Sequence, residues 1–89
     1  MFVEIVSPEK TLFTGDVSSV HLPGSEGSFQ ILNNHAPIVS TLKEGLIKLK
    51  GKFDNKSENL NIINSNEASL EIQSGVVEMK NNKLIILVD

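Results

Sequence analysis

The chain has 89 residues, enough for one small domain that buries roughly 60% of the surface its unfolded form would expose. It contains no cysteine, which excludes disulfide scaffolds, cysteine-based zinc sites and thiol catalysis. The formal net charge of −3 and the dispersed lysines offer no basic stripe for a phosphate backbone, so we expect no nucleic-acid partner.

Apolar and polar residues alternate along several short segments, which is the two-residue period of half-buried β-strands. The clearest cases are Val3 and Ile5, then Ile47 and Leu49 among Lys48, Lys50 and Lys52, then Leu70 and Ile72 among Ser69, Glu71 and Gln73. Turn residues recur between these segments, from Ser7-Pro8 to Asn81-Asn82. We predict one all-β domain over residues 1–89, a two-sheet β-sandwich of about ten strands.

The candidate chemistry is sparse, beginning with His21. It alternates with Val20 and Leu22 along a strand, so it is predicted to lie on the outer face with Ser19 and Val17. There it would contact solvent or a partner. Neither histidine of the chain has a second histidine or a carboxylate at the spacing of a metal site, so we expect no bound metal.

The region from Pro23 to the strand at 38–42 contains the other candidates. Gly24-Ser25-Glu26-Gly27 resembles a phosphate-binding loop only superficially, because a strand follows it and it lacks the lysine of a P-loop. Its glycines are expected to permit positive φ in a tight turn. His35 lies in a second turn. A catalytic histidine needs a nucleophile to deprotonate, and no sequence motif places one beside His35, so a structural or partner-binding role is expected.

Two further segments matter for assembly and location. The composition of Lys52 to Asn59 predicts a polar hairpin tip. Its glycosylation sequon Asn55-Lys56-Ser57 is expected to stay unmodified, because the first residues show no export signal. The longest apolar run, 84–88, is far shorter than the roughly 20 residues that cross a bilayer. This run is apolar on both faces, so either another element or a partner is expected to cover its second face.

Four segments, in order and over essentially the whole chain, resemble the epsilon subunit of F-type ATP synthases. They are Ile5-Val6-Ser7-Pro8-Glu9 with Leu12-Phe13-Thr14-Gly15, the run from Leu22 to Ile38, Gly45-Leu46-Ile47-Lys48, and Ser74-Gly75-Val76-Val77-Glu78. The resemblance implies a non-catalytic rotor subunit without a cofactor, at the foot of the central stalk on the cytoplasmic face of the bacterial inner membrane. Its implied partners are the gamma subunit, the polar loops of the c-ring and the catalytic head.

By position in the family, the turn of Ser25, Glu26, Gly27 and Ser28 would face the c-ring, and His35 and Ser40 would face gamma. The sequence departs from the family at Gln30, where glycine is frequent, at Asn33, where proline is frequent, and at Ser28, where an acidic residue is frequent. The last departure argues against a charge-based ring contact at that position.

Many family members continue into a helical hairpin that inhibits ATP hydrolysis, whereas these residues end at Asp89. We therefore expect coupling and assembly without hairpin inhibition or nucleotide binding. Two alternatives stay open: a free-standing β-sandwich that binds a small ligand in a concave pocket, and a small enzyme. The sequence displays no poised acid, base or nucleophile for the enzyme.

Overall fold

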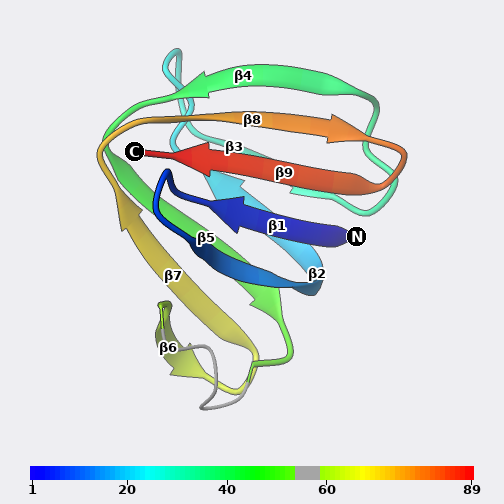
Figure 1. The fold of residues 1–89 in the computed structure, drawn as a ribbon. Coiled ribbons are helices and arrows are strands. Elements are labelled where there is room, and N and C mark those ends of the chain that lie inside the picture. Colours follow the sequence, from blue (N-terminus) through cyan, green and yellow to red (C-terminus); the bar gives the residue numbers. More distant parts are fainter. Residues whose placement is uncertain (54–58) are drawn as a thin grey trace.

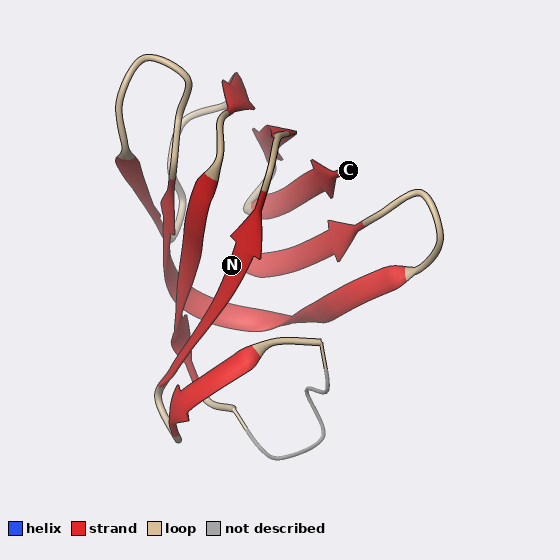
Figure 2. Ribbon diagram, turned by 90° about the vertical axis from the view of Figure 1, so that its left-hand side faces the viewer, coloured by secondary structure: helices blue, strands red, loops and turns tan. Residues whose placement is uncertain are grey.

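The computed structural model describes residues 1–53 and 59–89, and every regular element in them is a β-strand (Figure 2). The strands are β1 (Phe2–Val6), β2 (Thr11–Leu22), β3 (Phe29–Leu32), β4 (Ile38–Leu42), β5 (Gly45–Gly51), β6 (Asn61–Asn64), β7 (Glu67–Ile72), β8 (Gly75–Lys80) and β9 (Lys83–Val88). The all-β prediction is confirmed, with nine strands in the described residues against the expected ten or so. The sequon and most of the expected hairpin tip lie outside these residues.

The strands follow the order β4-β8-β9-β1-β2-β5-β7-β6, with β3 also paired to β2 (Figure 1). The long strand β2 joins two sheets, because its first half pairs with β1 and its second half pairs with β3 and β5. A register shift between Val17 and Ser19 marks the change. We call β4, β8, β9, β1 and the first half of β2 the β9 sheet, and β3, the second half of β2, β5, β7 and β6 the β5 sheet.

The first and last strands lie side by side in the middle of the β9 sheet (Figure 1). β1 pairs parallel with β9 and antiparallel with β2, so residues from both ends of the chain meet the core together. The β8–β9 hairpin closes through Asn81 and Asn82, whose φ angles are 53° and 57°. Asparagine tolerates this left-handed region, and two such residues suit the twist of a tight hairpin.

The predicted alternation is reproduced in the core. Val3, Ile5, Ile47 and Leu49 are fully buried, and the lysines around the last two are exposed. These four buried residues belong to one apolar cluster, to which both sheets contribute side chains. Ser69 lies on the outer face, as predicted, yet it is buried, because this short side chain is flanked by the cross-strand neighbours Lys48 and Asn61.

The last strand is buried on one face and partly open on the other. Leu84, Ile86 and Val88 lie in the core, whereas Leu87 is 52% exposed and Ile85 is half-buried. Leu87 lies beside the exposed Val76 of β8. Within the described residues, therefore, the chain leaves part of the second apolar face of β9 uncovered.

Candidate functional site

A turn at residues 23–28 packs against the end of β4. The backbone N–H of Lys43 donates to the carbonyl of Pro23 at 2.9 Å, and that of Ser25 donates to the carbonyl of Thr41 at 3.0 Å. An isolated bridge links Gly24 and Leu42 between these two bonds. The turn therefore acts as a short extra strand along the C-terminal part of β4.

The two glycines of this turn serve different purposes. Gly27 has a φ of 134°, a conformation that L-amino acids with a side chain rarely adopt, although the position that a Cβ would occupy is open space. Gly24 is required by crowding, since a Cβ there would lie 2.5 Å from the Gly27 carbonyl oxygen and 2.7 Å from the Phe29 ring. The expectation of positive φ is confirmed for Gly27, and Gly24 is explained by close approach.

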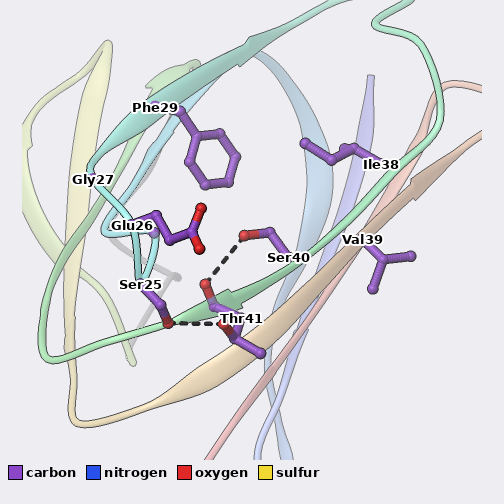
Figure 3. A pocket seen from close by; sticks show the side chains of 9 residues that line it. Ser25, Glu26, Gly27, Phe29, Ile38, Val39, Ser40 and Thr41 are labelled. Atoms are coloured by element: carbon purple, nitrogen blue, oxygen red, sulfur yellow. Dashed lines mark hydrogen bonds between the residues drawn. The ribbon is translucent and has the colours of Figure 1, made fainter.

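Between this turn and β4 lies a cavity of about 440 Å³, lined by residues 24–27, Phe29 and residues 38–41. Figure 3 shows the side chains of Phe29 and Glu26 directed into this space, facing those of Ile38 and Ser40, whereas Val39 points away from it. The Thr41 hydroxyl donates to the Ser25 hydroxyl at 2.8 Å, and the Ser40 hydroxyl donates to the Thr41 carbonyl at 3.1 Å (Figure 3). The cavity thus combines an aromatic and aliphatic wall with hydroxyl groups and one carboxylate.

The structure brings together some of the predicted site residues and separates others. Ser25, Glu26, Gly27 and Ser40 line the one cavity, although the family resemblance implied a different partner for Ser40 from that of the other three. Ser28 is exposed at the end of the turn without lining the cavity. Phe29, Ile38 and Thr41 were not predicted as site residues, and only the pairing of the turn with β4 reveals them.

His35 lies three residues before the start of β4, whereas Ser40 is the middle residue of this strand. The His35 ring is exposed, and its Nδ1 is 2.7 Å from the carbonyl oxygen of Ala36, to which it donates in the matching tautomer. The preceding Asn34 has a φ of 60°, and its backbone N–H donates to the side chain of Asn82 at 2.8 Å. Of the two predicted gamma-facing residues, therefore, one lies in the turn before β4 and the other lies within the strand.

His21 lies on the outer face of the β5 sheet, as predicted, between Gln30 of β3 and Lys48 of β5. It is half-buried, and its Nδ1 is shielded from solvent without a hydrogen-bond partner among the residues that the structure describes. The prediction for Val17 is wrong, because the register shift after this residue directs its side chain into the core. In the part of the chain that the structure describes, no cluster of three metal-ligating side chains occurs.

The cavity is suited to contact rather than to covalent chemistry. Its hydroxyl groups are engaged with each other and with the backbone, and neither histidine is among its lining residues. A serine or threonine nucleophile requires an adjacent base within hydrogen-bond reach. The exposed Glu26 makes no hydrogen bond to these hydroxyls among the contacts of the described residues.

Comparison with known proteins identifies the family. The family model of the ATP synthase delta/epsilon chain β-sandwich domain matches residues 1–89. The ATP synthase epsilon chain of Leptospira interrogans is 42% identical over 98% of this chain and 59% of the relative, and that of Chlorobium limicola is 38% identical over 98% and 86%. The chain therefore spans less than two thirds of the first of these relatives.

Solved structures agree on the fold. The central stalk and c-ring structure of the Tetrahymena thermophila mitochondrial ATP synthase contains a chain that matches with a TM-score of 0.73 at 19% identity, covering 98% of this chain and 61% of that one. A chain of the Euglena gracilis mitochondrial ATP synthase matches with a TM-score of 0.77 at 12% identity, covering 97% and 48%. At such identities the likeness shows the fold, and the family follows from the sequence matches. This chain belongs to the family of the β-sandwich domain of the ATP synthase delta/epsilon chain.

Proposed function

We propose that this domain is a non-catalytic part of the central stalk of an F-type ATP synthase, where it binds the gamma subunit and the c-ring and helps to couple ion translocation to ATP synthesis. The observation that carries the proposal is the match of the delta/epsilon β-sandwich family over residues 1–89. Relatives that share 38 to 42% of their aligned residues with this chain are ATP synthase epsilon chains.

The exposed turn is the proposed contact for the polar loops of the c-ring. Ser25, Glu26, Gly27 and Ser28 are all exposed, and their polar side chains suit a polar partner surface. The hydrogen bonds to Thr41 of β4 hold Ser25 in place, which limits the conformational entropy that the turn loses when a partner binds. With serine at position 28 and the Glu26 carboxylate directed into the cavity (Figure 3), the proposed contact with the c-ring is polar rather than charge-based.

The strand β4 and its flanks are the proposed contact for gamma. His35 precedes the strand, Ser40 lies within it, and Val39 between them is 68% exposed. An exposed β-branched side chain on a paired strand gives a partner a rigid apolar contact. The catalytic head is a further proposed neighbour through gamma.

We place the domain at the cytoplasmic face of the bacterial inner membrane, held there by the synthase complex. In residues 1–53 and 59–89, no helix is long and apolar enough to cross a membrane.

A pull-down and titration against the gamma subunit of the same organism tests the proposal, with gamma alone and with the catalytic head present. We expect a stable one-to-one complex with gamma. Absence of binding, when both proteins give the melting curves of folded domains, would contradict the proposal. A matched measurement with c-ring in detergent tests the second contact.

The cavity supports a second candidate, a module that binds a small ligand. Its volume of about 440 Å³ lies within the usual range for ligand sites, and it combines apolar walls with hydroxyl groups. Thermal melting in the presence of a metabolite library distinguishes the two. A shift of several degrees for one compound class, together with no affinity for gamma, would favour this candidate.

A further inference from the structure

β4 is the outermost strand of the β9 sheet, and only one of its sides is paired along its length (Figure 1). On that side β8 pairs with every residue from Ile38 to Leu42. On the other side the turn segment pairs with the last part of β4, and its final bond runs from Ser25 to Thr41. On the N-terminal side of Thr41 the turn leaves the strand, so the edge at Ile38 to Ser40 is open within residues 1–53 and 59–89.

Alternation along the strand identifies the backbone N–H and C=O groups that face the open edge. In an antiparallel pair, successive residues direct their N–H and C=O groups alternately toward one neighbour and the other. The Thr41 carbonyl accepts from Ser25, so Thr41 directs its groups away from β8. Val39, two residues earlier, must do the same. Among the described residues, no strand or bridge pairs with Val39 on that side.

The open edge also lacks the usual protection against strand addition. Natural edge strands carry lysine, proline or a bulge that discourages a further strand. β4 reads Ile-Val-Ser-Thr-Leu, without a charge, a proline or a register shift, and its β-branched residues favour the extended conformation. A strand from another protein could therefore extend the β9 sheet at this edge.

The cavity beside the edge defines the side chains that such a strand would carry. Phe29 and Ile38 form an apolar wall, and the Glu26 carboxylate points into the same space (Figure 3). Glu26 has no ion-pair partner among the contacts of the described residues. A strand added next to Val39 directs alternate side chains to opposite faces of the sheet, so one would enter the cavity. An aliphatic stem with a basic end fits both the wall and the carboxylate.

We infer that gamma is held by strand addition: an extended gamma segment with a basic side chain pairs with the free edge of β4 and places that side chain in the cavity. The inference rests on the proposed function, since it describes how gamma would be bound. Backbone bonds to Val39 and Thr41 would fix the register of the added strand, and the cavity would select its side chain.

The test compares Val39→Pro with Val39→Thr in the whole chain, each titrated with gamma from the same organism. Proline removes the outward N–H of residue 39 and obstructs an incoming strand, but it leaves the bonds to β8 intact, because edge strands tolerate proline at such positions. Threonine keeps the backbone N–H and nearly the same shape but exchanges one methyl group of the apolar contact for a hydroxyl, so it measures the side-chain contribution alone. We expect a dissociation constant at least about tenfold higher than wild type for Val39→Pro and at most about threefold higher for Val39→Thr.

Amide hydrogen exchange of the wild-type chain supplies a second readout that needs no variant. The Val39 and Thr41 amides are expected to exchange rapidly in the free chain and to slow by at least about tenfold with gamma bound. Glu26→Gln is expected to weaken binding by about threefold and to reduce its salt dependence.

The outcomes separate the inference from the proposed function. If Val39→Pro binds gamma as tightly as Val39→Thr, or if the two amides stay unprotected in the complex, strand addition is wrong while gamma binding stands. If the wild-type chain shows no affinity for gamma, both are wrong. If Val39→Pro does not fold, amide protection alone decides between support and rejection.

Discussion

Two adjacent residues of β9 provide a strict test of how the sandwich is built. Ile86 is fully buried between Ile5 of β1 and Val77 of β8, whereas Leu87 is 52% exposed on the opposite face. Truncation of a fully buried isoleucine to alanine costs about 2–5 kcal/mol, because it removes buried methyl groups and leaves a cavity. A chain of 89 residues has a free energy of unfolding of roughly 4–13 kcal/mol. Ile86→Ala should therefore remove a large share of the stability.

Leu87→Ala is the matched control, because it removes a similar number of carbon atoms from the next position. About half of its side chain is already in water, so we expect a loss below about 1 kcal/mol. For a domain of this size, 1 kcal/mol corresponds to roughly 4–8 °C in melting temperature, which separates the two variants clearly. Thermal unfolding followed by circular dichroism measures both. Equal losses would refute the assignment of the two faces and show that the outer face of β9 is covered in the free chain.

Three further outcomes follow from the structure. Gly24→Ala should lower the free energy of unfolding by about 1–3 kcal/mol in urea titration, because the added Cβ meets a carbonyl oxygen at 2.5 Å; a neutral result would contradict the crowding argument. His21→Leu should leave stability unchanged or raise it by up to about 1 kcal/mol in the same assay, since it removes a buried Nδ1 without a partner, and a clear loss would imply an unseen hydrogen bond. Raising salt from about 0.05 to 0.3 M should weaken gamma binding by less than about fivefold in calorimetry, because a contact made largely through backbone and apolar groups is little screened; a steeper dependence would indicate several ion pairs.

Alternation along single strands could be read from the sequence because it depends only on which residues need to leave water. Val3, Ile5, Ile47 and Leu49 are all in the core, as their spacing predicts. The same rule failed at Val17, because a register shift inserts an extra residue into β2 and reverses the face of everything before it. A bulge depends on how β2 meets β5, and no local pattern in β2 records that pairing.

The cavity could not be predicted for a related reason. Its two halves are separated in sequence, and the bonds between Ser25 and Thr41 span 16 positions. The glycine turn and the apolar strand were each identified, but their meeting depends on the chain returning through β3 and the second turn to lie at the edge of the β9 sheet. The family resemblance therefore implied surfaces for different partners at Ser25 and Ser40, and the fold places both residues around one cavity.

This shared space has a mechanical consequence for the proposed function. The turn that would meet the c-ring is bonded to the end of β4 and to Lys43 just after it, through the two backbone bonds of the Gly24–Leu42 bridge and one hydroxyl pair. The strand β4 itself would meet gamma. A load on the turn would reach β4 through peptide groups held on both sides, since β8 pairs with β4 along its whole length. A rotor element has to pass torque without bending, and the end of β4, which is paired on both sides, resists bending better than a loop. An added gamma strand would close the open part of the same edge, so that the ring-facing turn and the gamma-facing strand would move as one continuous sheet.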